Sequence, residues 1–573
     1  MTPGGPTNPG RRAVLKAGAA AGGALLVGFY FPLRESEAVQ SPTRRFEPNG
    51  FIRIDKQGIV TLVMPQVEMG QGIYTSVAMI LAEELDAAIE QVVLEHAPPN
   101  DKLYANPATG LQSTGGSTSV RAFWLPLRKA GASARALMVQ AAANTWNADP
   151  AGCRTERGEV IHSSGKTLPY GALIDKASKL TPPNDPPLKP ANEFKLIGQS
   201  LKRFDTPEKV NGKVMYSVDI MLPGMKFATL AICPEFGGQV DRVDDSKAMA
   251  IPGVRQVVVL DDLVAVIGDH MWAAKRGLDA LNIAWKSGPH AAVDTTEIWK
   301  QLRAASNQEG AVAKSVGDIG RGLSQGERFE AEYELPLLAH ATLEPLNCTV
   351  HVKPDSCEVW VGSQVLARAQ SIAAKVTGLP LEKVVVHNHI IGGGFGRRLE
   401  VDYVEKAVRI AQRVDGPVKV MYTREQDTTH DIYRPAYHHR LTATLSNGRV
   451  GAWRHKVSGS SILARWLPPA FQKGIDRDAV DGAADVVYDF PNLHVEYVRA
   501  EPPGVLTGWW RGVGANSNWF AIESFVDELA KKAGKDPVEF RRSMLDNSPR
   551  MKAVMELATS KAGLKPMQLA CSK

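Results

Sequence analysis

Four glycine-rich loops contain the candidate functional residues of this sequence. They span residues 67–72, 113–119, 392–398 and 508–514, and each precedes a stretch with helical periodicity. Glycine lets a backbone approach a ligand closely, and a helix N-terminus adds partial positive charge, so each loop could bind an anion. One such loop alone is usually a turn. Four in one chain, with Gln, Ser, Thr and Arg beside the glycines, predict one large phosphate-bearing ligand held from several sides.

The common nucleotide and hydrolase motifs do not account for these loops. Gly392, Gly394 and Arg397 fail to complete G-x-G-x-x-G, because the third glycine is missing. The chain also has no Walker lysine motif, no HExxH and no G-x-S-x-G. A nicotinamide dehydrogenase is therefore disfavoured, and a binding protein without chemistry stays open as an alternative.

Composition places the chain among globular proteins. It has 573 residues, of which 44% are hydrophobic and 22% charged, which is enough for three or four domains. A net charge of +6 is too small a surplus over this length to indicate a nucleic-acid partner. The five cysteines form no CxxC, so we expect no iron–sulfur cluster and no structural zinc in this chain.

The first segment has the pattern of an export signal. Arg11 and Arg12 precede an apolar run over residues 17–31, which is shorter than the roughly 20 residues of a membrane span. Residues 36–38 offer a small-x-small cleavage site. Residues 1–38 thus resemble a twin-arginine signal peptide, which predicts a periplasmic protein exported in the folded state.

The remaining pattern mixes strands and helices and predicts an α+β fold. Alternation over residues 51–64 predicts strands, helical spacing begins at Ile73, and a second helix over about 120–146 should kink at Pro126. Five prolines over residues 180–194 predict a stiff linker. Beyond it we expect short strands at 227–233, 254–259 and 264–267, a helix at 272–281, a connector at 304–326 and renewed alternation over 329–545.

The four loops resemble those of the molybdopterin-binding subunit of the xanthine dehydrogenase/aldehyde oxidase family. The nearest pattern is the isoquinoline 1-oxidoreductase beta-subunit type, whose segment order is permuted, and the similarity covers nearly the whole chain after Val39. It implies a multidomain α+β large-subunit fold with a small α/β hammerhead domain. The implied divisions are the signal peptide 1–38, a permuted molybdopterin-binding segment 45–180, the linker 181–195, the hammerhead domain 196–300, a molybdopterin-binding domain 327–548, and the truncated start of a further molybdopterin domain at 549–573.

The resemblance also carries residue roles. Gln364, 31 residues before Phe395, matches the glutamine that hydrogen-bonds the apical molybdenum oxygen; Phe395 and Arg511 match residues near the metal. These three are the catalytic candidates, and no side chain is expected to ligate the metal directly. The cofactor-binding candidates lie in the first three loops: Gly70, Gln71, Gly72, Thr114, Gly115, Gly116, Ser117, Thr118, Ser119, Gly393, Gly394, Phe395, Gly396 and Arg397.

The implied activity is that of a molybdenum hydroxylase. The cofactor would be molybdopterin with molybdenum, in the cytosine dinucleotide form that is usual for bacterial members. The substrate would be an aldehyde or an N-heteroaromatic small molecule, with water as the oxygen source. Electrons would pass to a separate small [2Fe–2S] subunit and then to an acceptor such as a cytochrome.

This sequence departs from the family at the general base. The family places a glutamate in a G-V-G-E segment near the C-terminus, whereas Gly512-Val513-Gly514 is followed here by Ala515. The chain ends at Lys573, before the expected second half of the metal domain. The alternatives are therefore a catalytically inactive truncated remnant, or one half of a split enzyme whose second chain supplies the missing glutamate.

Several other residues have simpler interpretations. We expect Glu344 to be a buried structural carboxylate, and Arg434, His438 and His439 to belong to a packed loop. Trp509 and Trp510 could equally shape a substrate pocket or fill the core. Glu400 lies one position from where purine-oxidising relatives place a substrate glutamate, and the register puts Leu399 there, which argues against xanthine as substrate.

Overall fold

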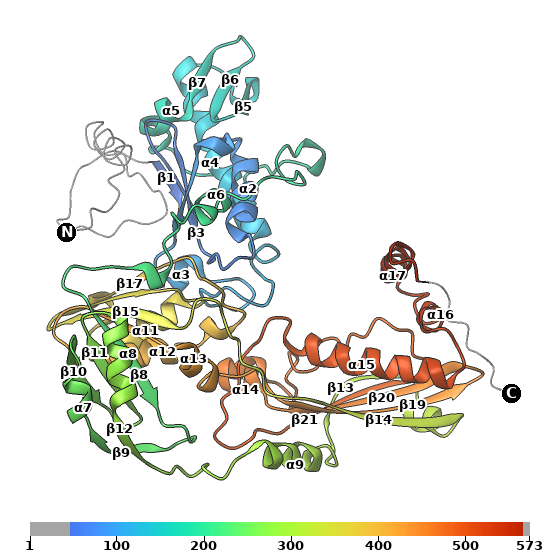
Figure 1. The fold of residues 1–573 in the computed structure, drawn as a ribbon. Helices are drawn as coiled ribbons and strands as arrows, with labels where there is room; N and C mark the ends of the chain where they lie inside the picture. Colours follow the sequence, from blue (N-terminus) through green and yellow to red (C-terminus); the bar gives the residue numbers. More distant parts are fainter. Residues whose placement is uncertain (1–45, 565–573) are drawn as a thin grey trace.

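The computed structural model describes residues 46–564. The twin-arginine segment and Cys571 lie outside the described residues. Figure 1 shows an upper lobe built from the first part of the chain, a lower sheet with its helices, and a long sheet that extends from it towards the C-terminus. Among the described residues, the structure contains no helix both long and apolar enough to cross a bilayer.

The upper lobe packs two helices on a four-stranded sheet. The strands, in sheet order, are β1 (Phe46–Asn49), β2 (Ile52–Ile54), β3 (Val60–Met64) and β4 (Val92–His96). The helices are α2 (Ile73–Leu85) and α4 (Trp124–Trp146), which share a hydrophobic core with the sheet. Helix α4 begins at Trp124, so Pro126 lies in its first turn, where a missing N–H leaves no helical bond unmade. The kink predicted at Pro126 was therefore wrong.

The proline-rich stretch is not a free linker. A small sheet of β5 (Cys153–Glu156), β6 (Glu159–His162) and β7 (Thr167–Pro169), with α5 (Tyr170–Ala177), extends the upper lobe before it. The stretch then returns to α4, where Arg128 and Arg135 donate to the carbonyl oxygens of Lys189 and Pro187. Lys189 is buried in this contact. Ion pairs and hydrogen bonds therefore hold the proline-rich stretch against the lobe, although its prolines alone predicted a stiff linker.

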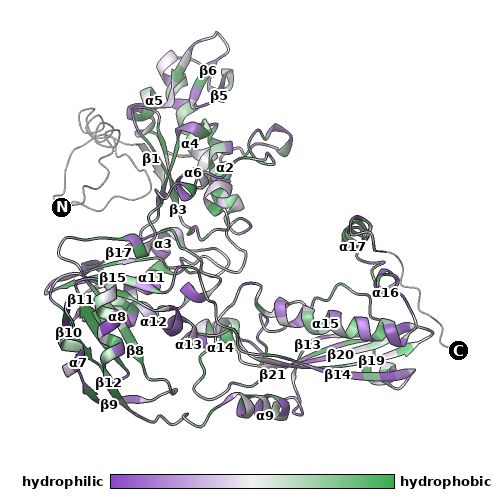
Figure 2. Cartoon of the chain, in the orientation of Figure 1, coloured by the Kyte–Doolittle hydropathy of each residue, from purple (hydrophilic) through white to green (hydrophobic). Residues whose placement is uncertain are grey.

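The lower sheet joins strands from two predicted domains. Its order is β10 (Val254–Val259), β11 (Leu263–Gly268), β8 (Lys226–Ile232), β18 (Val418–Met421), β15 (Asn347–Lys353), β16 (Ser356–Val361) and β17 (Val384–Asn388). Strands β8 and β18 pair in parallel, so the sheet runs across the boundary expected between residues 300 and 327. Every residue of β11 is buried, which explains its unbroken apolar sequence, and Figure 2 shows this region as hydrophobic.

Short elements surround this sheet. They are α7 (Ser246–Met249), α8 (Met271–Ala280), α11 (Leu366–Thr377), α12 (Asp402–Ala411), α13 (Arg424–Thr429) and the pair β9 (Gln239–Asp244) and β12 (Asn282–Lys286). Helix α3 (Asp101–Tyr104) lies between the upper lobe and this sheet, and α6 (Thr206–Val210) lies beside α2 in the upper lobe (Figure 1). Helices α11 and α12 cover one face, and their apolar residues share a core with the strands. The strands and helix predicted over 254–281 are confirmed to within a few residues.

The extended sheet contains five strands and carries a long helix. Its order is β13 (Ala311–Val316), β21 (Leu493–Arg499), β20 (Arg449–Gly459), β19 (Tyr437–Ser446) and β14 (Glu327–Leu335). Helix α15 (Val513–Lys532) lies along it, with α9 (Thr295–Ala305), α10 (Ile319–Leu323), α14 (Ile462–Trp466), α16 (Pro537–Arg542) and α17 (Pro549–Lys561) around it. The predicted connector 304–326 contains β13 and α10. The sequence did not indicate the strand, because β13 lies at the edge of the sheet and its apolar alternation is weak.

Candidate functional site

Three of the four glycine-rich loops meet around Gln364. Its Nε2 donates to the carbonyl oxygen of Thr114 at 2.7 Å, and the Thr114 N–H donates back to the Gln364 carbonyl at 2.9 Å. The Thr114 hydroxyl accepts from the Val67 N–H at 2.9 Å, which ties the second loop to the first. A Cβ on Gly394 would lie 2.7 Å from Gln364 Oε1 and 2.9 Å from Met69 Sδ, so the third loop touches both.

The fourth loop joins the same group through Trp509. A Cβ on Gly396 would lie only 1.8 Å from the Trp509 carbonyl oxygen, so only glycine permits this approach. That oxygen also lies 2.8 Å from His340 Nε2, which fixes its direction. Arg511 follows in the same loop and is exposed. All four loops therefore gather around one place in the fold.

The first loop owes its shape to Glu68. This carboxylate is fully buried and accepts from the N–H groups of Gly70, Gly72 and Tyr74 at 2.8, 3.1 and 3.2 Å. Gln71 closes the loop on the outside, since its Oε1 accepts from the Met69 N–H and its Nε2 donates to the Val67 carbonyl. The backbone of residues 68–74 is thus folded around one buried charge.

The second loop presents its backbone to the outside. Thr118 is buried and bonds to Asn106 and to the Gly115 carbonyl, while Ser119 donates to Gln66 Oε1 at 2.7 Å. Within the described residues, the N–H groups of Gly115, Gly116 and Ser117 donate to no protein acceptor. Three consecutive free amides of this kind could receive phosphate or carbonyl oxygens of a ligand.

Backbone strain concentrates in these loops. Nine non-glycine residues of the described chain have positive φ, and four of them lie in or beside the group: Ser117 at 52°, Ala341 at 47°, Phe395 at 55° and Val513 at 51°. Val513 is β-branched, for which this conformation is especially unfavourable. Such strain persists where surrounding structure imposes it, and it is commonly found at binding and catalytic sites.

Arg397 has a different place from the other predicted cofactor residues. Its side chain is 1% exposed and forms ion pairs with Asp402 at 2.7 Å and Asp431 at 2.6 Å. Asp431 in turn accepts from the backbone N–H of His340 and contacts its Nδ1 at 2.9 Å. The Arg397 guanidinium therefore anchors the third loop to its surroundings, and its backbone N–H donates to the Gly394 carbonyl within the loop at 2.9 Å.

Glu344 is a buried structural carboxylate, as expected. It accepts from Ser217 Oγ, from the N–H groups of Val218 and Gly392, and from Asn347, and pairs with Arg398 at 3.1 Å. Burial alone would raise the pKa of Glu344, but the Arg398 charge and these hydrogen bonds lower it overall. An ionised Glu344 thus holds the start of the third loop.

The histidines outside the loops belong to the core. His438 and His439 lie on β19 and are fully buried, and His439 Nδ1 lies 3.0 Å from His455 Nε2 on β20. Burial lowers the pKa of His455 to about 3, so the ring is neutral at ordinary pH. Arg434 donates to the Pro336 carbonyl. These histidines are thus ordinary packed residues, as expected, but they lie on a strand and not in the packed loop that the sequence predicted.

Glu400 and the tryptophans flank the group. Glu400 is 8% exposed and pairs with Arg465 at 2.5 Å, so its carboxylate is already engaged. Trp509 packs edge-on against Trp466 at 4.7 Å and donates to Asp478 at 2.8 Å. Trp509 therefore packs against the core. The buried indole N–H of Trp510, in the fourth loop, donates to no acceptor in the described residues.

The sequence did not reveal the residues that support the first loop from outside. Arg203 Nη2 lies 2.9 Å from Glu68 and 2.7 Å from Asp205, and its Nη1 donates to the Gly70 carbonyl at 2.9 Å. Burial alone would raise the pKa of Asp205, but Arg203 and Lys209 lower it overall. The only signal was the charge pattern R-F-D-T-P-E-K after the linker, which is too common to assign a partner 135 positions away.

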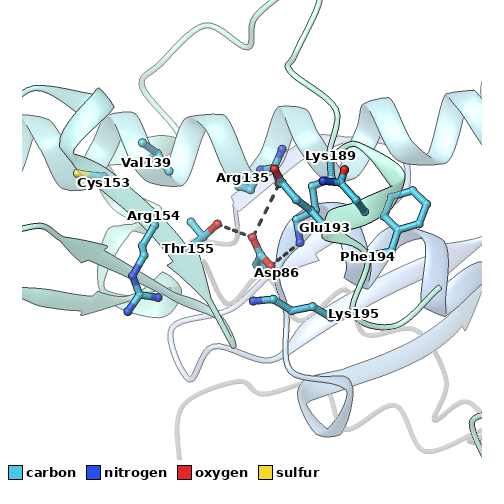
Figure 3. A pocket seen from close by; sticks show the side chains of 11 residues that line it. Asp86, Arg135, Val139, Cys153, Arg154, Thr155, Lys189, Glu193, Phe194 and Lys195 are labelled. Carbon is cyan, nitrogen blue, oxygen red and sulfur yellow. Dashed lines mark hydrogen bonds and ion pairs between the residues drawn. The ribbon is translucent and has the colours of Figure 1, made fainter. Parts of the chain in front are cut away.

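A separate pocket of about 620 Å³ lies beside the former linker (Figure 3). At its floor Asp86 meets Thr155, Arg135 and Lys189, with Lys189 Nζ at 2.5 Å. Its lining residues come from α4, β5 and the linker, and include none of the four glycine-rich loops. The pocket is therefore a product of the ion pairs that hold the linker, and it is not part of the loop site.

The site residues fit a large pterin-type group. Gln364 is 3% exposed, and its Oε1 has no hydrogen-bond partner in the described residues, which leaves a buried acceptor facing the loops. Gly394 lets the third loop approach this acceptor closely, because a Cβ there would lie 2.7 Å from Gln364 Oε1. Among the described residues, no three His, Cys, Asp or Glu side chains gather as metal ligands.

Comparisons with known proteins identify the family of the chain. The molybdopterin cofactor-binding domain profile matches residues 304–545, and a second molybdopterin cofactor-binding domain profile matches residues 25–225. The chain is 32% identical over 559 residues to the beta subunit of isoquinoline 1-oxidoreductase from Brevundimonas diminuta, covering 89% of this chain and 71% of that protein. It is 31% identical over 545 residues to a nicotinate dehydrogenase subunit from Pseudomonas putida, covering 90% of this chain and 45% of that protein.

Solved structures show the same fold. Aldehyde oxidoreductase from Desulfovibrio gigas matches with a TM-score of 0.53 at 18% identity, over 68% of this chain and 49% of that one. Quinoline 2-oxidoreductase from Pseudomonas putida 86 matches with a TM-score of 0.51 at 14% identity, over 64% of this chain and 54% of that one. The fold is thus that of a molybdenum hydroxylase large subunit. The chain belongs to the xanthine dehydrogenase/aldehyde oxidase family, whose members are molybdenum-dependent oxidoreductases.

Proposed function

We propose that the chain is the large subunit of a molybdenum hydroxylase that oxidises an aldehyde or an N-heteroaromatic compound. The observation that carries the proposal is the meeting of three glycine-rich loops around Gln364, whose buried Oε1 has no partner in the described residues, with the fourth loop packed against the third at Gly396. Relatives named for isoquinoline, nicotinate and aldehyde oxidation support this substrate class. Glu400 pairs with Arg465, and Leu399 occupies the matching register, so xanthine is not the proposed substrate.

The chain's own residues would hold the group and exclude water. The free amides of Gly115, Gly116 and Ser117 suit a pyrophosphate, and the Gln71 loop and Gly394 suit the flat pterin. When bound, the group would take two electrons from the substrate carbon while water supplies the oxygen atom. Phe395, exposed and held at positive φ, would pack against the substrate face, and Arg511 would lie beside it.

Glu344 and Glu400, two carboxylates near the loops, are not free to accept a proton. Both oxygens of Glu344 are taken up by Arg398, Asn347 and neighbouring donors, and Glu400 is paired with Arg465. A general base must reach the proton it removes and must be free to accept it. This observation favours a second candidate function, in which the chain is half of a split enzyme and another polypeptide segment provides the glutamate.

We further propose where the protein works and with what. The twin-arginine pattern supports a periplasmic location reached in the folded state, and the cytosine dinucleotide form of the cofactor follows the bacterial habit of the family. Relatives named as subunits of isoquinoline 1-oxidoreductase and nicotinate dehydrogenase support a separate [2Fe–2S] subunit as the first electron acceptor. A cytochrome would then take the electrons onward.

Turnover assays test the proposal and separate the two candidates. The full chain would be produced with its iron–sulfur partner and assayed with benzaldehyde and isoquinoline, using a dye acceptor and ¹⁸O-labelled water. Labelled product from the chain and its iron–sulfur partner alone supports the complete hydroxylase. Product that forms only after a segment bearing the missing glutamate is added supports the split enzyme. A molybdenum-loaded protein with no product in either case contradicts both.

A further inference from the structure

Residues 189–205, here called the strap, run antiparallel to helix α2. Hydrogen bonds hold the strap at the C-terminal end of α2 and again at its N-terminal end. Near the C-terminal end of α2, Glu83 Oε2 accepts from the consecutive N–H groups of Lys195, Leu196 and Ile197 at 2.8, 2.6 and 3.1 Å. Lys189 Nζ adds contacts to Glu83 at 3.2 Å and to Asp86 at 2.5 Å, as Figure 3 shows for Asp86.

The other end of the strap reaches the first glycine-rich loop. Phe204 N–H donates to Thr75 Oγ1 in the first turn of α2 at 3.1 Å. Arg203 contacts Glu68 and the Gly70 carbonyl, and Asp205 receives Arg203 at Nε and Nη2. The strap therefore connects a clamp at one end of the helix to the cofactor loop at the other.

The charges at the loop end are buried and mutually dependent. Glu68 is 0% and Asp205 1% exposed, and Lys209 completes the group by pairing with Asp205. Glu68 can receive the N–H groups of Gly70, Gly72 and Tyr74 at low cost only while a cation compensates its charge. Arg203 supplies that cation in a planar fork that reaches Glu68, Asp205 and the Gly70 carbonyl together.

We propose that Arg203 is a positioning residue for cofactor binding: through Glu68 it holds the backbone of residues 68–74 in the shape that receives the pterin. This inference rests on the proposed function. In this role Arg203 acts through Glu68 and the Gly70 carbonyl, and the strap delivers it from outside the loop. The first loop would then depend on an anchor that belongs to none of the recognised cofactor motifs.

The test compares R203K with R541K in the full chain. R203K keeps the charge and removes the fork; R541K makes the same change at Arg541, which pairs with Glu523 and Asp527 on α15, away from the first loop. Residues that support a bound metal group typically change its affinity by about 10–100-fold. We therefore expect R203K to lose molybdenum during dialysis at least about tenfold faster than wild type, and R541K to match wild type. Equal loss from R203K and R541K would overturn the proposal.

Amide hydrogen exchange on the cofactor-free chain provides an independent readout. In R203K, we expect faster exchange confined to residues 68–74, where Glu68 accepts the backbone N–H groups. R203K could also melt at a lower temperature than R541K, and the exchange pattern then separates a local effect from a general loss of stability. Faster exchange across the whole upper lobe would show a general loss of stability and would overturn the proposal. A wild-type chain that binds no molybdenum would contradict the proposed function. The exchange measurement on the cofactor-free chain would still test whether Arg203 holds residues 68–74 in place.

Discussion

At the scale of single residues, buried carboxylates shape the site more than its glycines do. Glu68 folds the first loop around three backbone N–H groups, and Glu344 holds the start of the third through Gly392 and Arg398. Glycine allows these conformations, but a buried charge that accepts several N–H groups selects one of them. The loops are therefore preformed by ionised side chains that lie behind them.

The Glu344 carboxylate should make the free energy of unfolding fall as the pH is lowered. Its pKa is lowered in the folded chain, so its contribution is complete above the ordinary value of about 4.5 and is lost as pH falls through the folded value. We expect E344Q to lower the free energy of unfolding by about 3–5 kcal/mol at pH 7, since Arg398 is left buried without its partner. Denaturant melts of both proteins from pH 7 to pH 3 measure this.

The matched control for this prediction is E297Q on α9. Glu297 is paired with exposed Lys300, and solvent screens such pairs, so the change should be small at every pH. The gap between wild type and E344Q should narrow below pH 4.5. A gap that stays constant down to pH 3 would show that Glu344 acts by packing and not by its charge.

Residue patterns in the sequence predicted the loops but not their supports. G-G-G-F-G and E-M-G-Q-G stand out because a rare spacing of glycines is visible along the chain. Arg203 lies 135 residues from Glu68, and single charged residues carry no mark of a distant partner. Arg397 shows the converse: it stands inside a recognisable motif, yet its side chain is engaged by Asp402 and Asp431.

At the scale of elements, α15 shows how the extended sheet is stabilised. Its buried residues recur at helical spacing and include Ala521, Ile522, Phe525, Val526 and Leu529. Phe525 packs beside Trp453 of β20, which stacks on Phe490 at 4.6 Å. Because α15 begins directly after the fourth loop, this packing also fixes where that loop starts.

Two substitutions on opposite faces of α15 test this packing. Phe525 is 1% exposed and Phe520 is 54% exposed on the same helix. F525A should lower the free energy of unfolding by about 3–5 kcal/mol, because it leaves a cavity in the core. F520A should change it by less than about 1 kcal/mol. Denaturant melts compare them, and equal effects would contradict the orientation of the helix.

Element types were easier to predict than element roles. Helices such as α2 and α8 and the strands of 254–268 follow from periodicity, since each repeats over several residues. The connector 304–326 concealed β13, and the proline-rich stretch concealed the strap, because edge pairing and ion pairs with distant residues leave no local period.

At the scale of the whole molecule, the loop site is assembled from segments far apart in the chain. Residues 67–119 come from the upper lobe, Gln364 and Gly394 from segments that follow β16 and β17 of the lower sheet, and Trp509 from the loop that precedes α15. The lower sheet includes β8 beside β18, so the predicted hammerhead strands and the metal-domain strands form one continuous support. Cofactor binding should therefore stabilise the whole arrangement against unfolding.

The most direct measurement is the molybdenum and pterin content of the full chain, purified after production in a host that makes the cofactor, alongside the variant G394A. The account predicts close to one molybdenum per wild-type chain and a strongly reduced content in G394A, whose new methyl group would meet Gln364 Oε1 at 2.7 Å. G320A, a glycine whose added Cβ meets nothing closer than 3.5 Å, should retain the wild-type content. A wild-type chain without molybdenum, or a G394A chain with full occupancy, would contradict the account.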